Sequence, residues 1–74
     1  MSNSHNFKEH SMKKEIFHAD GSLRAVIYDT GYNGRQEAHS ASGQLLGVYN
    51  PDADETFDDS GSRVGRGNLL MTLI

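Results

Sequence analysis

Acidic side chains gather between positions 52 and 59, and they form the densest group in the chain that could bind a metal. The five acids are Asp52, Asp54, Glu55, Asp58 and Asp59. Oxygen-rich clusters suit calcium, and the first two aspartates have the opening spacing of an EF-hand loop. The match then fails, because Phe57 stands where that loop needs glycine and Arg63 stands where it needs a bidentate glutamate. We expect a solvated acidic loop, with a weak cation site at its four aspartates as the alternative.

A glycine-rich stretch near the end of the chain has some features of a phosphate loop. Residues 61–68 read Gly-Ser-Arg-Val-Gly-Arg-Gly-Asn. The glycine spacing is one residue too long for a P-loop and the Lys-Ser/Thr pair is missing, which excludes a nucleotide-hydrolysing loop. Backbone N–H groups at a helix N-terminus beside two arginines remain a weaker anion site. Its candidate residues are Arg63, Gly65, Arg66, Gly67 and Asn68. The alternative is that the glycines permit a bend and the arginines are exposed.

Nucleophilic catalysis would have to use His39, Ser40 and Ser42, which are close neighbours in the sequence. A catalytic triad needs a base and an orienting acid from separate elements, and no Gly-x-Ser-x-Gly turn is present. We expect His39 to pack instead, at a position that Phe17 and Phe57 fill elsewhere in the chain. No catalytic residue and no cofactor are assigned, and the chain is predicted not to be an enzyme.

The first twelve residues differ in character from the rest. Residues 1–12 contain one large apolar side chain besides methionine, Phe7, and show no period of strand or helix. His5 and His10 lie five apart, whereas a spacing of four stacks two imidazoles on one helix face. We predict a flexible N-terminal arm over 1–12 and one small domain over 13–74.

The elements that must position these residues follow from an internal repeat. When Gly21, Gly43 and Gly61 are aligned, four features recur around them. A ring lies four residues before each glycine, Asp or Ser stands directly before it, and Ser or Gln stands directly after it. A very small residue follows four positions beyond each glycine; these residues are Ala25, Gly47 and Gly65.

Each repeat unit has the pattern of a β-hairpin. Asp-Gly or Ser-Gly supplies the positive φ of a tight primed turn or of a three-residue loop with a bulge. The flanks carry strand formers, among them Ile16, Val26 and Val48. The small residue in each returning strand indicates that something approaches the backbone closely there. We predict an all-β fold of antiparallel hairpin repeats, with an ordinary meander of unrelated hairpins as the alternative.

This repeated pattern over residues 16–68 resembles the β-flower proteins, which are small bacterial proteins built from hairpin repeats arranged like petals. The shared pattern is a ring, two or three polar residues, glycine, two residues, an apolar residue and then glycine or alanine. The resemblance implies a hairpin-repeat fold and does not imply any activity.

The last seven residues, Asn-Leu-Leu-Met-Thr-Leu-Ile, are the most apolar segment of the chain. Asparagine is a favoured N-cap, and the apolar residues then share one helical stripe, so the pattern predicts a short C-terminal helix. The alternative is a strand, whose two faces would both be apolar and would both need burial. The apolar side chains must close the open face of the hairpin layer or dock on a partner subunit. The predicted interface consists of Leu69, Leu70, Met71, Leu73 and Ile74.

The composition limits the classes of function. The chain has 74 residues, of which 35% are hydrophobic. In so small a core, the free energy gained by burial roughly equals the entropy cost of ordering the chain, unless a disulfide, a metal or association adds stability. It has no cysteine for disulfides or thiolate metal sites, so we expect a homo-oligomer, a dimer or larger. A net charge of -3 argues against nucleic acid as a partner. The sequence shows no membrane span and no signal peptide, which predicts a cytoplasmic protein.

These observations favour a non-enzymatic interaction or structural module that self-associates and that has room for a further protein partner. The alternative is a binding protein for a small anion or a nucleotide-like molecule, held by the arginines of the glycine-rich stretch.

Overall fold

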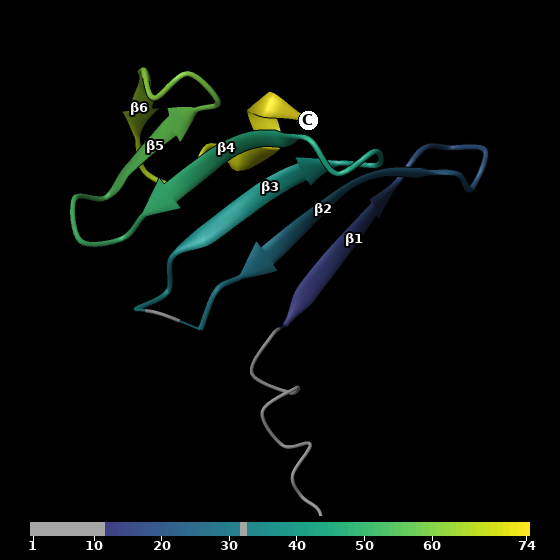
Figure 1. Cartoon of the computed structure of the whole chain (residues 1–74), viewed down its shortest axis with the longest axis horizontal. Coiled ribbons are helices and arrows are strands. Elements are labelled where there is room, and N and C mark those ends of the chain that lie inside the picture. The colour runs from purple at the N-terminus through teal and green to yellow at the C-terminus, as the bar shows by residue number, and fades with distance from the viewer. Residues whose placement is uncertain (1–11, 32) are drawn as a thin grey trace, which may run out of the picture.

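The computed structural model describes residues 12–31 and 33–74, which form one antiparallel sheet of six strands (Figure 1). Each strand pairs with the next one along the chain, so the order in the sheet is β1-β2-β3-β4-β5-β6. The predicted all-β fold of antiparallel hairpins is confirmed. The predicted arm lies outside the described residues, apart from Met12. The strands are β1 (Lys13–Phe17), β2 (Leu23–Asp29), β3 (Gln36–Ser40), β4 (Leu45–Asn50), β5 (Glu55–Asp58) and β6 (Arg63–Arg66).

The three hairpins of the sequence repeats, β1–β2, β3–β4 and β5–β6, share one turn geometry. In each, the N–H of the residue before the loop donates to the carbonyl four residues later, at 2.8 to 2.9 Å. The loop glycine donates back to the carbonyl of that first residue, at 2.9 to 3.0 Å. Gly21, Gly43 and Gly61 have φ between 90° and 93°, which a side chain would strain. Of the two predicted turn types, the structure has the three-residue loop.

A β-bulge also recurs at the same place in each hairpin. The strand pairs nearest the turns are Phe17–Leu23, His39–Leu45 and Phe57–Arg63, and one extra residue follows in each returning strand. These extra residues are Arg24, Leu46 and Val64. A bulge bends and twists its strand locally. Equal turns and equal bulges make the three hairpins structural repeats of one unit.

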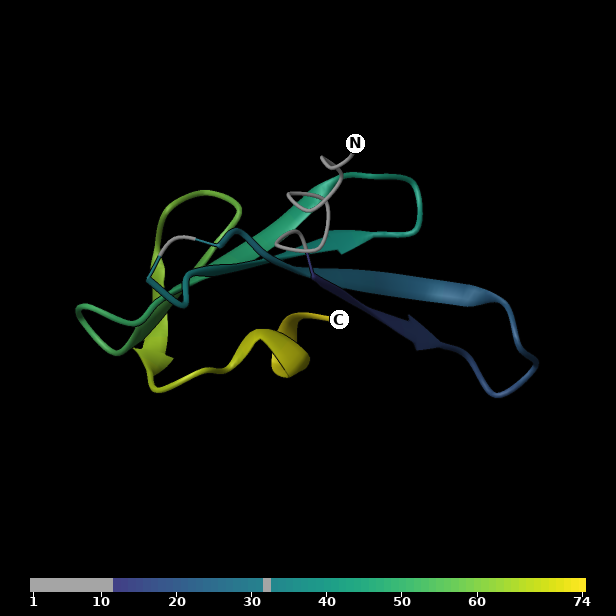
Figure 2. The same cartoon turned by 90° about the horizontal axis from the view of Figure 1, so that it is seen from below.

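The C-terminal segment, residues 68–74, lies against one side of the sheet (Figure 2). It contains a single turn of 3-10 helix, η2 (Leu70–Leu73). The predicted C-terminal helix is therefore reduced to one short turn that begins after Leu69. The N–H of Leu69 donates to Thr56 Oγ1, which ties the start of this segment to β5.

The sheet consequently has two different faces. We call the side under the C-terminal segment the covered face; it carries Ala25, Ala38, Gly47, Thr56 and Gly65. The opposite side is the open face, and residues directly opposite in neighbouring strands share it. Its central residues are Val26, Tyr28, His39, Val48 and Phe57. In the described part of the chain, no element packs over the open face.

The core lies between the covered face and η2, and it is small. Ala25 and Ala38 are fully buried, and Leu70 is 1% exposed. A Cβ on Gly47 would lie 2.7 Å from the carbonyl oxygen of Phe57 and would collide with Leu73. A Cβ on Gly65 would lie 2.8 Å from Cδ1 of Leu69. The predicted close approach to the small repeat position is confirmed at both glycines, and the C-terminal segment contributes to it at both.

Across residues 12–31 and 33–74, no helix has the length and apolar character needed to cross a membrane.

Candidate functional site

Thr56 is the residue that fastens the C-terminal segment to the sheet. Its side chain is fully buried in β5. Its hydroxyl donates to the carbonyl of Gly67 at 2.7 Å and accepts the N–H of Leu69 at 2.9 Å. Both backbone groups would otherwise lack these partners in a partly buried place. Nothing in the sequence distinguishes this threonine from an ordinary strand former, and sequence reasoning missed it.

Three further side-chain hydrogen bonds fix the path of the segment. Asn68 Nδ2 donates to Gln36 Oε1 at 2.9 Å, and Asn68 Oδ1 accepts the N–H of Leu70 at 3.2 Å. At the far end, Arg24 Nη2 donates to the carbonyl oxygen of Ile74 at 2.5 Å. The segment thus crosses from β6 over β4 and β3 to β2.

Most of the predicted interface residues pack against the sheet of their own chain. Leu70 is buried, while Leu69, Leu73 and Ile74 are half-buried. Met71 alone of the five remains strongly exposed, at 56%. Of the two outcomes that the sequence allowed, the segment closes one face of its own sheet. This leaves the open face, rather than the segment, as the broad surface for a partner.

The open face carries a cluster of side chains that hold one another in place. The rings of Tyr28 and His39 meet edge to face, with centroids 5.2 Å apart and an interplanar angle of 86°. His39 Nε2 lies 3.2 Å from Glu37 Oε1, and its Nδ1 lies 3.3 Å from the carbonyl oxygen of Gly43. Val26, the cross-strand neighbour of His39, is 7% exposed. His39 packs as the sequence indicates.

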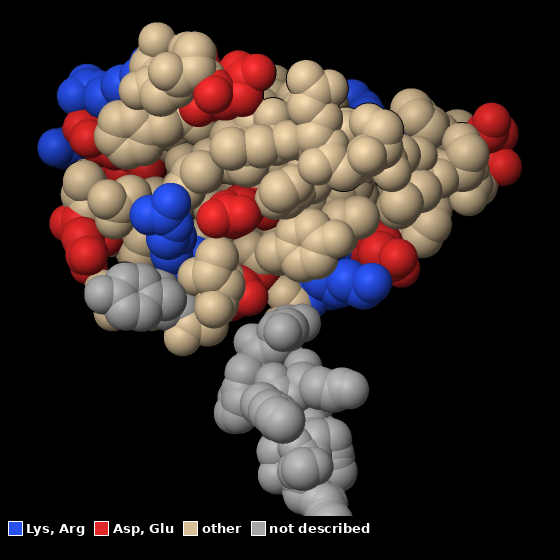
Figure 3. Space-filling view, in the orientation of Figure 1, with Lys and Arg blue, Asp and Glu red and all other residues tan. Residues whose placement is uncertain are grey.

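Uncharged side chains dominate the middle of the open face. Figure 3 shows this face, with most charged groups around its outline and an acidic and a basic group beside each other further in. The ring position of each repeat, four residues before the turn glycine, lies on this side of the sheet by strand alternation. The three residues are Phe17, His39 and Phe57.

A cavity of about 450 Å³ lies beside the C-terminal segment, where the segment leaves the start of the sheet uncovered. Its apolar part includes Met12, Ile27 and Met71, and both methionines are more than half exposed. Amine, carboxylate and amide groups stand around them. These polar lining residues are Lys13, Lys14, Asp29, Gln36 and Asn68.

The predicted anion site has a different geometry from the one expected. Arg63 pairs with Glu55 at 2.8 Å. The N–H of Gly67 donates to the carbonyl of Asp54 at 2.7 Å, and the N–H of Leu70 is taken by Asn68. Gly65 lies in β6, against Leu69, and Arg66 ends that strand. Of the N–H groups expected to bind an anion, that of Gly67 therefore has a partner within the chain, and only a four-residue helix follows this stretch.

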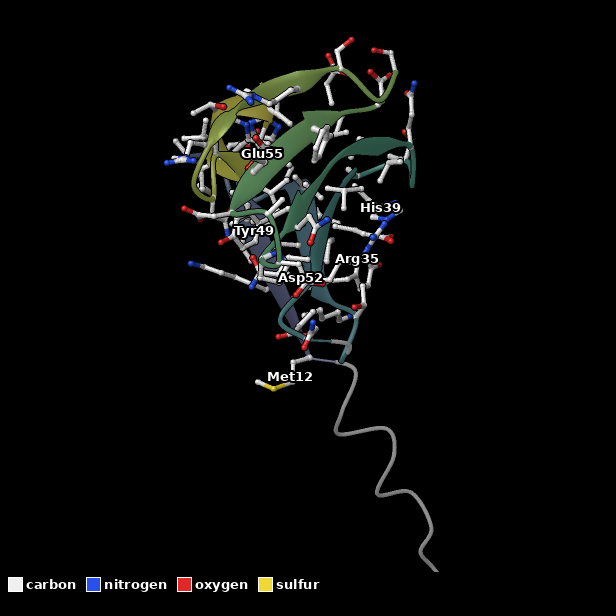
Figure 4. The ribbon with its side chains drawn as sticks, turned by 90° about the vertical axis from the view of Figure 1, so that its left-hand side faces the viewer. Met12, Arg35, His39, Tyr49, Asp52 and Glu55 are labelled. Atoms are coloured by element: carbon white, nitrogen blue, oxygen red, sulfur yellow. The ribbon has the colours of Figure 1, made fainter. Side chains whose placement is uncertain are left out.

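The predicted acidic cluster is divided by β5. Asp52 and Asp54 lie in the loop before this strand, whereas Asp58 and Asp59 lie at its other end. Asp52 Oδ1 accepts a hydrogen bond from Asn33 at 2.8 Å. Figure 4 shows Asp52 apart from Glu55 at the start of β5. Among the described residues, no three His, Asp or Glu side chains gather closely enough to hold a metal ion.

Hydrogen bonds shift the pKa values of groups in these loops. The Ser60 hydroxyl, then the Ser62 N–H, hold the pKa of Asp58 below its usual 3.8. Tyr49 donates its hydroxyl to Asp54 at 2.8 Å, and this bond raises the pKa of Tyr49 above 10.0. These are bonds that fix loops and turns.

The sequence neighbours His39, Ser40 and Ser42 are not arranged as a nucleophile and its base. Ser40 Oγ lies 2.8 Å from Ser42 Oγ and accepts the N–H of Gln44 at 3.1 Å. His39 turns instead to Glu37 and to the carbonyl of Gly43. These serine bonds belong to the second hairpin turn.

Comparison with known proteins gives no relative: no family model, no curated protein and no solved structure matches this chain. Function is therefore inferred from the geometry of the sheet.

Proposed function

We propose that this chain is a non-enzymatic interaction or structural module that associates with further copies of itself. The observation that carries the proposal is the one-sided sheet, whose open face lies bare in the described part of the chain. Leu70 is the only large apolar side chain that the described structure buries completely. Burying one leucine contributes about 1.5 to 3 kcal/mol, against an ordering cost of about 1.5 kcal/mol per residue. A second layer on the open face supplies the missing burial.

The resemblance to β-flower proteins belongs to this proposal. It is supported by three hairpins with the same turn, bulge and small residue. We further propose a cytoplasmic location, with which a chain without cysteine is compatible. The net charge of -3 argues against a nucleic-acid partner.

The proposal is tested by the mass and the unfolding of the full chain over a concentration series. Association makes the melting temperature rise with protein concentration, because only the folded state is bound. A species of 8.2 kDa at every concentration, with a constant melting temperature, would contradict the proposal.

A second candidate function, binding of a small anion, is favoured by the cavity beside the C-terminal segment. Its volume of about 450 Å³ lies within the range of small-molecule sites. Its lining combines methionine and isoleucine with the basic residues Lys13 and Lys14 of the edge strand.

A thermal-shift panel of carboxylates, phosphates and nucleotides tests this candidate, since a ligand raises stability by RT ln(1 + [L]/Kd). Lys14→Gln removes the response if the ligand lies in the cavity. Arg66→Gln is the matched control, and it removes the response if the ligand lies at the glycine-rich stretch. If no compound in the panel raises the melting temperature, anion binding is excluded at both places.

A further inference from the structure

We infer that the open face is the surface on which a second copy of this chain packs, so that two sheets stack face to face about a two-fold axis. The inference rests on the proposed self-association and names the surface that carries it. In such a packing the two inner layers of side chains form a common core about 10 Å thick.

The centre of the open face has the side chains of an interface hot spot. Aromatic residues contribute most binding energy when they are central and already held in position. Tyr28 is 39% exposed and is braced by the edge-to-face contact with His39. His39 is in turn held by Glu37 and by the Gly43 carbonyl. The rings therefore lose little conformational freedom when a partner covers them.

The open face is large enough for a stable dimer. The molecule measures 42 × 36 Å across the sheet and 17 Å through it. Stable interfaces bury about 800 Å² on each partner, which is a part of this outline. The cavity on the covered side, at about 450 Å³, is of the size that takes a small molecule rather than a protein domain.

The charges also favour this face. By strand alternation it carries three basic and three acidic side chains, so it is neutral in a chain of net charge -3. These are Lys13, Arg63, Arg66, Glu15, Glu37 and Glu55. All six aspartates lie in turns, in loops or at strand ends: Asp20, Asp29, Asp52, Asp54, Asp58 and Asp59. The negative excess at the ends of the sheet opposes end-to-end contact and leaves stacking of the open faces unopposed.

The two edges of the sheet disfavour the other route to a dimer, which is pairing of edge strands. The edge strand β1 begins with Lys13 and Lys14, and the edge strand β6 carries Arg63 and Arg66. Pairing of β6 with β6 or with β1 of a second copy would bring these basic side chains together. The bulge after Arg63 interrupts the edge further. Charged and bulged edges are devices that prevent sheet extension.

The test is sedimentation equilibrium of the full chain and of variants on the two faces. Tyr28→Lys and Phe17→Lys place a charge on the open face, and both side chains are exposed enough to be replaced without a new cavity. Each should raise the dimer dissociation constant at least about tenfold. Tyr28→Phe should leave it unchanged. Met71→Lys is the matched control on the other side, where a residue that is 56% exposed should leave dimerisation intact.

Far-UV circular dichroism separates loss of the interface from loss of the fold. Tyr28→Lys and Phe17→Lys should keep the sheet signal of the wild-type chain as monomers and regain the dimer mass as concentration rises, whereas a folding defect removes the sheet signal from the monomer. If both variants keep the wild-type dissociation constant while Met71→Lys loses the dimer, the interface lies on the covered side. The inference then fails and the proposed function stands. If the wild-type chain stays a monomer throughout, the proposed function fails, and the inference fails with it.

Discussion

Thr56 joins the sheet to the C-terminal segment through a single buried hydroxyl. In Thr56→Val the side chain keeps its shape, but the carbonyl of Gly67 and the N–H of Leu69 lose their partner. We expect the free energy of unfolding to fall by about 1 to 3 kcal/mol, the cost of unsatisfied buried polar groups. Urea denaturation measures it.

The control for this variant is Thr72→Val, which removes a hydroxyl that is exposed and donates to the carbonyl of Leu69. Its effect should stay within about 0.5 kcal/mol, as for most surface changes. Equal losses in the two variants would show that the Thr56 hydroxyl does not fasten the C-terminal segment to the sheet.

Gly47 lies where the segment presses closest to the backbone. In Gly47→Ala the new Cβ meets Leu73 and the carbonyl oxygen of Phe57, so the segment must move away. We expect a loss of about 1 to 3 kcal/mol, typical of overpacking. Amide hydrogen exchange of residues 69–73 should also become faster.

Gly43→Ala separates this crowding from ordinary backbone strain. Its Cβ would meet nothing within 4 Å, but its φ of +93° disfavours alanine. This variant should lose stability without faster exchange in residues 69–73. Slow exchange there in Gly47→Ala would contradict the crowding at Gly47.

The pKa of Asp58 predicts how the third hairpin responds to acid. Because the folded pKa lies below the unfolded value near 3.8, the stabilising contribution of Asp58 is fully present above pH 3.8. It is lost as the pH falls through the lower folded pKa. Carboxyl NMR titration should give a midpoint below 3.8 for Asp58, and for Asp20, which the Ser22 hydroxyl holds in the same way.

Ser60→Ala should raise the midpoint of Asp58 and leave that of Asp20 unchanged, and Ser22→Ala should do the reverse. A midpoint at 3.8 or above for Asp58 in the wild-type chain would show that these turn bonds do not form in solution.

At the scale of elements, the hairpins were predictable because their signals are local. A glycine at each turn, with Asp or Ser before it, fixes three loops whose observed bonds are the same. The small residues Gly47 and Gly65 correctly indicated a close approach. What approaches them could not be predicted, because the contact with Leu69 or Leu73 depends on where a distant segment folds back.

The candidate sites were less predictable for the same reason. The acids at 52–59 are close in sequence, but an extended strand carries Asp52 and Asp58 to opposite ends of β5. The N–H groups of Gly67, Leu69 and Leu70 follow two arginines in the sequence, but they donate to Asp54, Thr56 and Asn68. Sequence spacing describes an isolated loop, whereas these groups are used by tertiary hydrogen bonds.

The C-terminal segment acts as the second layer of the covered face, and Leu70 is its anchor. Leu70→Ala should reduce the free energy of unfolding by about 2 to 5 kcal/mol, the usual cost of such a truncation. This is comparable to the whole stability that a core of this size supplies. Thermal denaturation followed by circular dichroism measures the loss.

Met71→Ala is the matched change on the neighbouring exposed side chain, and it should leave the melting temperature nearly unchanged. If the two variants melt alike, or if Leu70→Ala melts as the wild type does, η2 is not the anchor of the covered face.

At the scale of the whole molecule, the described chain is a sheet with one face covered by another layer and one face uncovered. The C-terminal segment of seven residues packs on the covered face. The open face has rings held in place, no net charge and a broad area. Charged side chains and a bulge at the edge strands oppose the addition of further strands. These features together describe one half of a sandwich, which a second copy completes.

Sedimentation equilibrium of the wild-type chain beside Tyr28→Lys, across a concentration series, is the sharpest test of this sandwich. We predict a wild-type mass of twice 8.2 kDa and a Tyr28→Lys chain that remains at 8.2 kDa until the concentration is raised at least about tenfold. Identical masses for the two chains at every concentration would contradict stacking of the open faces.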